Sequence, residues 1–316
     1  MKPYMKQVSL FSLFILLAFT LSLNHAYAAT ITVGSQPAGL AFDSHKNEVF
    51  VANYGSGTVS VISDATNMVT AIICVGAVPE GITFDSHLNE VFVANAGSNT
   101  VSVISDATNK VTGTIAVGSF PFAVAFDSDK NEVFVANYGS GTISVISDAT
   151  NKVTATITVG SHPQGLAFDS YKNEIFVAND GSNTVSVVSD ATNKVTATIT
   201  VGSHPYGVAF DSNKNEIFVT NILSGTVSVV SDATNKVTAT IAVDSAPREV
   251  AFDSHLNEVF VANAGSNTVS VISDATNKVT ATVTVGAQPW AVACDSNKDE
   301  IFVTNTFSNT ISVLPG

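Results

Sequence analysis

Four short apolar runs, separated by polar turns, recur along most of this chain. In the first complete unit they span Gly39–Asp43, Glu48–Asn53, Thr58–Ser63 and Val69–Val75. Their lengths, their Val, Ile, Phe and Thr content and the lack of a helical period predict β-strands. Gly, Asn, Asp and Ser fill the connections, as tight turns require. Each unit is therefore predicted to be a four-stranded antiparallel meander.

The unit recurs with a period of 42 residues and no insertion. The second run, such as Val49–Ala52, is apolar on both faces, whereas the fourth, such as Val153–Val159, alternates strictly. A strand that is apolar on both faces must be covered on both, so it belongs inside and the alternating strand outside. Radial stacking of such modules predicts an all-β fold, a seven-bladed β-propeller. A proline opens each copy, at Pro37, Pro79, Pro121, Pro163, Pro205, Pro247 and Pro289.

The two ends of the repeat region complement each other. The last copy, which begins at Pro289, has three runs before the sequence ends. The missing fourth run stands at the other end, because Ala29–Val33 is identical to Ala197–Val201 of a complete copy. We predict that residues 29–33 complete blade seven and close the ring, which removes open edge strands. The predicted propeller domain spans residues 29–316.

Residues 1–28 have the layout of a secretory signal peptide. Lys2 and Lys6 precede an apolar run from Val8 to Leu23 and a small-x-small site that ends at Ala28. We predict cleavage after Ala28 and a secreted, cell-surface or periplasmic protein. A membrane anchor is the alternative, which the four Ser and Thr residues of the run disfavour. No later apolar run is long enough for a membrane span.

The chain is acidic, with 26 Asp and Glu residues against 13 Lys and Arg residues. Its net charge of −13 becomes −15 when the two lysines leave with the signal peptide. Nucleic acids and anionic membranes repel such a chain, so neither is an expected partner.

The second run of each copy ends in a recurrent tetrapeptide. It reads Phe-Val-Ala-Asn at 50–53, 92–95, 134–137, 176–179 and 260–263, and Phe-Val-Thr-Asn at 218–221 and 302–305. With the 42-residue period, it resembles the YVTN family of β-propeller repeats, although Phe replaces the Tyr of the family signature in every copy. The resemblance implies a seven-bladed propeller of archaeal surface-layer or bacterial cell-surface and periplasmic type, mostly without assigned activity. It implies fold strongly and function weakly.

Motifs of catalysis and cofactor binding are missing from the sequence. It has no Gly-x-Ser-x-Gly elbow, no His-Glu-x-x-His helix and no haem-binding Cys-x-x-Cys-His. We interpret the recurrent Asp43, Asn47 and Glu48 as turn residues rather than a calcium site, because their spacing is not that of an EF-hand loop. His162 and His204 precede the prolines of neighbouring copies, but two ligands without a third do not make a metal site. No metal and no cofactor is predicted.

The remaining histidines and the cysteines are interpreted as surface or structural residues. His45, His87 and His255 share one turn position that other copies fill with Asp, Tyr or Asn, which indicates a tolerant surface. Cys74 falls on an outer strand and Cys294 on an inner one. Because a disulfide needs its two Cα atoms within about 7 Å, we expect no bridge between them.

The positions beside the junction proline differ between the copies. The residues after it are Ala38, Glu80, Phe122, Gln164, Tyr206, Arg248 and Trp290, and those before it are Gln36, Val78, Phe120, His162, His204, Ala246 and Gln288. In an antiparallel meander the junction and the second-to-third-strand loop lie on one side of the ring, and the post-proline residue opens the innermost strand. We therefore expect the post-proline residues to surround the mouth of the axial channel.

Trp, Tyr and Arg are the residues most enriched among binding hot spots, so this ring of side chains is the predicted binding site. The first hypothesis is an exported, non-enzymatic propeller that binds a protein, peptide or glycan of the cell envelope there. Its predicted site comprises Glu80, Phe122, Gln164, Tyr206, Arg248, Trp290, His162 and His204.

Other hypotheses remain open. A lyase-like or lactonase-like enzyme would use Glu80, His162, His204, Glu249 or Asp244 as acid, base or metal ligand. Alternatively, the ring is a structural subunit of a surface lattice. Neutral variation on a solvent-facing loop would also explain the differences at the mouth. Arg248, the only arginine, either pairs with Glu249 or Asp244 or faces the channel mouth. The ligand and the oligomeric state are not predicted.

Overall fold

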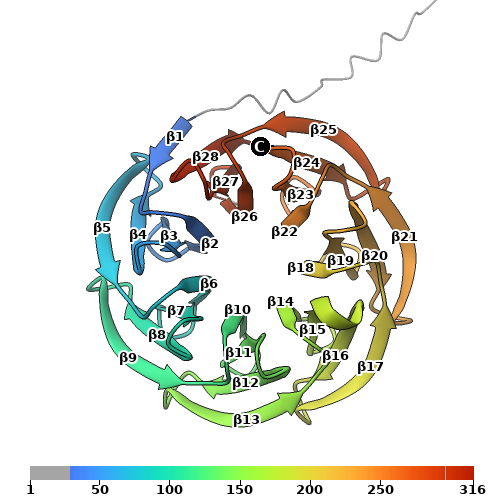
Figure 1. Cartoon of the computed structure of the whole chain (residues 1–316), viewed down its shortest axis with the longest axis horizontal. Coiled ribbons are helices and arrows are strands. Elements are labelled where there is room, and N and C mark those ends of the chain that lie inside the picture. The colour runs from blue at the N-terminus through green and yellow to red at the C-terminus, as the bar shows by residue number, and fades with distance from the viewer. Residues whose placement is uncertain (1–28, 296) are drawn as a thin grey trace, which may run out of the picture.

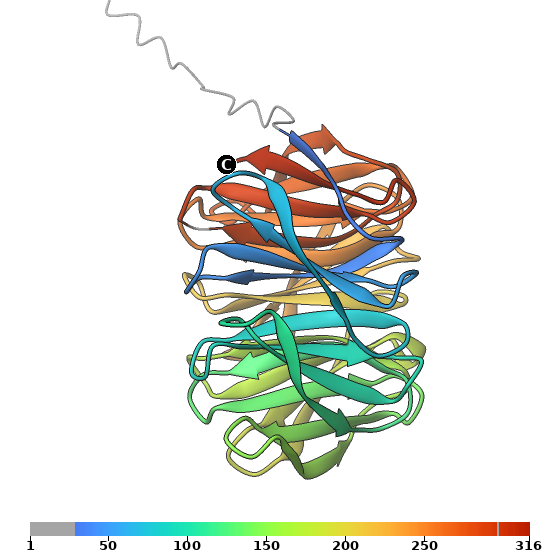
Figure 2. The same cartoon turned by 90° about the vertical axis from the view of Figure 1, so that its left-hand side faces the viewer.

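The chain folds into a closed ring of seven blades around a central axis (Figure 1). The computed structural model describes residues 29–295 and 297–316, and the predicted signal peptide lies outside them. Each blade is a four-stranded antiparallel sheet, and Figure 2 shows the ring edge-on with the blades side by side. The predicted fold class, blade number and radial order of the strands are confirmed.

The strands of the seven blades form four radial layers. The innermost strands are β2 (Pro37–Asp43), β6 (Pro79–Asp85), β10 (Pro121–Asp127), β14 (Pro163–Asp169), β18 (Pro205–Asp211), β22 (Pro247–Asp253) and β26 (Pro289–Asp295). The second strands are β3 (Glu48–Asn53), β7 (Glu90–Asn95), β11 (Glu132–Asn137), β15 (Glu174–Asn179), β19 (Glu216–Asn221), β23 (Glu258–Asn263) and β27 (Glu300–Asn305). The third strands are β4 (Thr58–Ser63), β8 (Thr100–Ser105), β12 (Thr142–Ser147), β16 (Thr184–Ser189), β20 (Thr226–Ser231), β24 (Thr268–Ser273) and β28 (Thr310–Pro315). The outermost strands are β5 (Met68–Cys74), β9 (Lys110–Ala116), β13 (Lys152–Thr158), β17 (Lys194–Thr200), β21 (Lys236–Ala242), β25 (Lys278–Thr284) and β1 (Ala29–Thr32). A short 3₁₀ helix, η1 (Asp180–Ser182), lies between β15 and β16.

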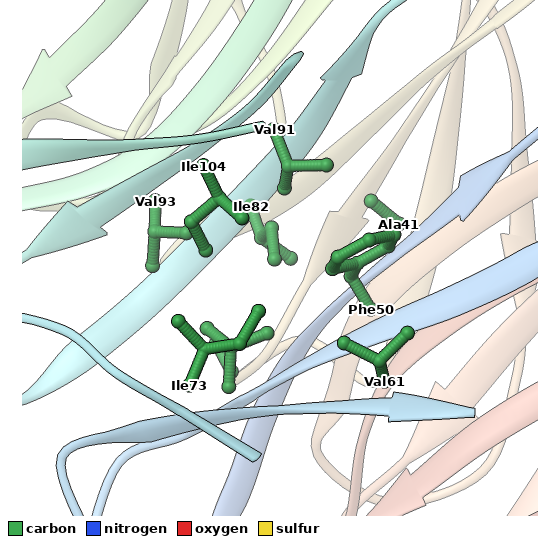
Figure 3. Close-up of a cluster of buried hydrophobic side chains, with 10 residues drawn as sticks. Ala41, Phe50, Val61, Ile73, Ile82, Val91, Val93 and Ile104 are labelled. Carbon is green, nitrogen blue, oxygen red and sulfur yellow. The ribbon is translucent and has the colours of Figure 1, made fainter. Parts of the chain in front are cut away.

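One fully buried phenylalanine per blade packs into the seam with the next blade. Phe50 of β3 lies with Val61 of its own blade against Ile82, Val91 and Val93 of the second blade (Figure 3). The equivalent phenylalanines of the other six blades are fully buried as well. Burial of such a side chain stabilises the fold by about 1.5–3 kcal/mol, so the seams hold the ring together.

The N-terminal strand closes the ring, as predicted. β1 pairs antiparallel with β28, with Ile31 opposite Ile311. Ile31 is buried in a cluster with Val49 of the first blade and Phe302 of the seventh. The strand thus completes the seventh blade and contributes to the seam with the first, one residue shorter than expected.

The turn residues that recur in every blade have structural roles within the ring. Asp43 is fully buried, and its Oδ1 accepts hydrogen bonds from the backbone N–H groups of His45 and Lys46. Asn53 at the end of the tetrapeptide donates from Nδ2 to Ser60 Oγ at 3.0 Å. The turn interpretation of the aspartate is therefore supported, because its carboxylate satisfies local backbone donors.

All three turn histidines, His45, His87 and His255, contact an aspartate of the neighbouring blade. His45 Nδ1 lies 2.9 Å from Asp106 Oδ2, and His87 Nδ1 lies 2.7 Å from Asp148 Oδ2. The three side chains are exposed, as the surface interpretation expects, but each also reaches an aspartate of the next blade, and Asp106 and Asp148 are buried. The expectation of free cysteines at 74 and 294 is confirmed.

Ile31→Ala tests ring closure. Large-to-small changes at buried isoleucines cost about 2–5 kcal/mol, so we expect the variant to lose that much free energy of unfolding in chemical denaturation. Thr32→Ala, on the same strand but exposed, is the control and should change stability by less than about 0.5 kcal/mol. Equal stability of the two variants would contradict a docked closing strand.

Candidate functional site

Each blade junction has an unusual backbone geometry. All seven residues that precede the junction proline have positive φ angles, between 51° and 58°, although none is glycine. Val78, at 58°, is β-branched and carries the greatest strain, since such residues avoid this region. The pairing of every innermost strand with its neighbour also shifts register directly after the proline, between Pro37 and Leu40 in the first blade. Bulges re-aim side chains, and here one redirects the post-proline residue.

All seven post-proline side chains line one cavity on the ring axis. Its volume is about 550 Å³, and its wall also includes residues from the second-to-third-strand loops. The hydrogen bond from Tyr54 N to Gln36 O, at 2.9 Å, ties such a loop to the junction beside it. The prediction that the blade junctions and the second-to-third-strand loops share one face of the ring is therefore confirmed. The lining post-proline residues are Ala38, Glu80, Phe122, Gln164, Tyr206, Arg248 and Trp290.

Arg248 faces this cavity. Its guanidinium carbon lies 3.7 Å from the centre of the Trp290 ring and 5.0 Å from that of Tyr206. Among the residues that the structure describes, no carboxylate lies within 4.0 Å of the guanidinium. Asp244 instead accepts a hydrogen bond from Thr268 Oγ1 at 2.7 Å. Cation–π contacts hold the arginine, and its Nε is buried without a hydrogen-bond partner.

Two glutamates lie near the arginine with unusually weak acidity. Glu80 is only 6% exposed, and burial raises its pKa to about 8 against the opposing pull of Arg248. Glu249 lines a smaller cavity of about 100 Å³, which shares Glu80 and Trp290 with the larger one. Burial raises the pKa of Glu249 to about 7. Near neutral pH, Glu80 is thus largely protonated and able to donate a hydrogen bond.

Aromatic rings extend from the floor of the cavity to its rim. Tyr206 is 1% exposed and makes edge-to-face contacts with Trp290 and Phe122, at 6.0 and 5.7 Å between centroids. Phe122 in turn lies 6.3 Å from Tyr138, whose ring stacks on His162 at 4.5 Å. The junction geometry folds the Tyr206 ring beneath its neighbours, so the ring forms part of the buried cavity wall.

The two pre-proline histidines do not converge. His162 stacks on Tyr138, whereas His204 Nδ1 lies 2.9 Å from Asp180 Oδ1. Neither lines the larger cavity. In the described part of the chain, neither belongs to a group of three residues that could hold a metal ion.

Three groups with metal-like composition lie instead on the opposite face, at blade seams. They are Asp43, His45 and Asp106; Asp64, Asp295 and Glu300; and Asp211, Glu216 and Asp274. Lysines reach into all three groups, for example Lys214 Nζ at 2.8 Å from Asp274 Oδ1 and Lys298 Nζ at 2.8 Å from Asp64 Oδ1. An ammonium group thus already supplies positive charge at these seams, which favours a structural role.

Two threonines that position the cavity wall were missed in the sequence. Thr220 Oγ1 accepts a hydrogen bond from Gly207 N at 2.8 Å and donates to Arg248 O in the next blade. Thr304 Oγ1 makes the same link from Ala291 N to Ala38 O. The signal was present, because these two blades alone read Phe-Val-Thr-Asn where the others have alanine.

Comparison with known proteins gives a family and a fold. A family model described as the choice-of-anchor I domain matches residues 114–308, more than half of the chain. The chain belongs to the choice-of-anchor I domain family. Hydrazine synthase of Kuenenia stuttgartiensis is similar in structure, with a TM-score of 0.82 and 18% identity over 94% of this chain and 99% of that chain. At this identity the likeness concerns the propeller fold alone. No curated protein matches.

Membership of the choice-of-anchor I domain family indicates a surface or secreted protein. Within residues 29–295 and 297–316, no helix is long and apolar enough to cross a membrane.

Glu80→Gln tests the protonation state of the cavity carboxyl. The folded state binds this proton more tightly than the unfolded state, whose pKa is near 4.5, so unfolding releases a proton and stability falls as the pH rises toward 8. Glutamine removes that dependence. We expect the variant to match wild type at about pH 4 and to exceed it by on the order of 4–5 kcal/mol at about pH 8.5. Urea denaturation at both pH values measures this, and an equal difference at both would contradict a buried neutral carboxyl.

Proposed function

We propose that this protein is an exported, non-enzymatic binding scaffold of the cell envelope or surface. It uses the cavity at the axial mouth, with the rim around it, to hold a protein, peptide or glycan partner. The predicted signal peptide would deliver it across the membrane, and its family membership agrees with a surface location.

One observation carries the proposal: seven side chains that differ from blade to blade line a single cavity of about 550 Å³. Ligand pockets typically have such volumes, with apolar walls and a few directed polar groups. Here aromatic rings make the walls, and Arg248, Glu80 and Gln164 supply the polar groups. On the opposite face most turn residues recur in every blade, apart from the position of His45, so most of the diversity lies on the proposed binding face.

The contacts of the histidines favour binding over catalysis. A nucleophilic mechanism needs a base within hydrogen-bond reach of a hydroxyl or thiol. In the described residues, His204 pairs with Asp180, and no serine, threonine or cysteine side chain hydrogen-bonds to its ring. Its pairing with Asp180, which lies between β15 and β16 of the preceding blade, gives His204 a structural role at the junction.

Capture of partners from envelope extracts tests the proposal with two matched exposed aromatics. Phe307 stands on the rim of the cavity and is 67% exposed, whereas Tyr171 is 70% exposed on the opposite face. We expect Phe307→Ala combined with Trp290→Ala to reduce the captured material at least tenfold, because both remove apolar contact area from the mouth. Tyr171→Ala should leave capture unchanged. Loss of capture with Tyr171→Ala alone, or equal capture by all forms, would overturn the proposed use of the mouth.

A further inference from the structure

The proposed binding cavity contains buried polar atoms that have no partner in the protein. Arg248 Nε and Gln164 Oε1 are both buried and unpartnered, and Glu80 lines the same wall. Buried polar groups in proteins are nearly always hydrogen-bonded, and leaving one unpartnered costs about 1–3 kcal/mol. Such a cluster in a cavity of this size indicates a ligand that supplies the missing hydrogen bonds.

The groups are arranged for an anion with a single charge. Arg248 can only donate, and Trp290 and Tyr206 hold its guanidinium without neutralising it. A planar guanidinium matches the two oxygens of a carboxylate. A phosphate carries up to two charges and would bring both beside Glu80 and Glu249, whereas a carboxylate brings one.

The shape of the cavity requires the group to enter end-on. The innermost strands surround the central axis (Figure 1), and the cavity wall includes residues from all seven of them, so an occupant that passes the rim reaches Arg248 along the axis. That rim has three exposed aromatic side chains, Phe120, Phe307 and Tyr54. Gln36, Gln288 and Thr306 lie beside them. A carboxylate at the end of a chain whose last side chains are apolar fits this arrangement. The carboxylate reaches Arg248 inside the cavity, and the apolar side chains lie at the aromatic rim.

The overall charge favours a peptide over an acidic glycan. A polyuronate has a carboxylate on each sugar and would meet a protein of net charge −13 along its whole length. A peptide that ends in apolar residues brings only its terminal carboxylate to the mouth.

We propose that the axial cavity captures the C-terminal carboxylate of a peptide or protein chain whose last residues are apolar. The carboxylate lies against the guanidinium of Arg248, and the last side chains pack on the phenylalanines of the rim. This inference rests on the proposed function, since it names the partner of that same site.

Peptide binding tests the inference directly. The probes are a pool of synthetic hexapeptides that end in Phe-Leu with a free carboxylate, and the same pool with a C-terminal amide. We expect the full-length protein to bind the acid pool at least tenfold more tightly in fluorescence polarisation. Arg248→Met keeps the apolar stem of the arginine without its charge and should abolish the difference. Its melting temperature, compared with wild type, shows that the ring still folds.

The response to pH provides a readout that a merely structural arginine would not give. The charged or titratable groups that line the two cavities are Arg248, Glu80, Glu249, Tyr206, Tyr54 and Tyr138. Glu80 becomes negative above about pH 8, which repels a carboxylate. Binding of the acid pool should therefore weaken as the pH rises from 7 to 9. A tenfold loss of affinity corresponds to about 1.4 kcal/mol of binding free energy. Glu80→Gln should bind at pH 7 and reduce the decline to the part that arises from Glu249, whose pKa is about 7.

The outcomes separate the two proposals. Equal binding of acid and amide pools, absence of binding to both, or preference for an oligouronate probe overturns the carboxylate inference. If the rim variant still loses capture of envelope material in those cases, the proposed function stands without it. If the rim variant also captures as much envelope material as the wild type, both proposals are wrong.

Discussion

The packing of one phenylalanine per blade against the next blade is the interaction on which the whole ring depends. Each of these side chains is fully buried, and each seam joins sheets from two repeats. Because β1 completes the seventh blade, all seven blades have four strands and each packs against a neighbour on both sides. The innermost strands are thereby fixed around the axis. Side chains that open these strands must point where the ring directs them.

That fixed frame allows irregular features at the mouth. Seven non-glycine residues adopt positive φ angles before the junction prolines, and buried polar atoms lack partners beside them. Such features reduce stability by amounts that a rigid surrounding structure can tolerate. In the rest of the described chain, the non-glycine residues with positive φ angles are all Asn or Asp, which tolerate this region. Only the junctions at the mouth place Gln, Val, Phe, His and Ala there. Departures from local rules concentrated on one side of a fold are typical of a binding site.

The fold could be predicted from the sequence because it rests on local and periodic signals. The 42-residue period gave the blade count, the polarity of each run gave the radial order, and Ala29–Val33 gave the closure. The gathering of the post-proline residues around the axis also followed from the meander. The burial of each post-proline side chain could not be predicted, because it depends on the register shift after the proline. Tyr206 and Glu80 are buried, whereas Arg248 and Trp290 are partly exposed. Contacts between blades, such as His45 with Asp106, join residues from different repeats, so no local pattern indicates them.

The fluorescence of Trp290 offers the most direct measurement of ligand binding at the axial mouth. It is the only tryptophan of the chain, and it lies in the cavity wall under the Arg248 guanidinium. A ligand that enters the cavity must change the surroundings of this ring. Binding at the mouth predicts a saturable change in emission during titration with the captured partner, at the concentrations where the complex forms. Formation of that complex with the Trp290 emission unchanged would contradict a binding site at the mouth.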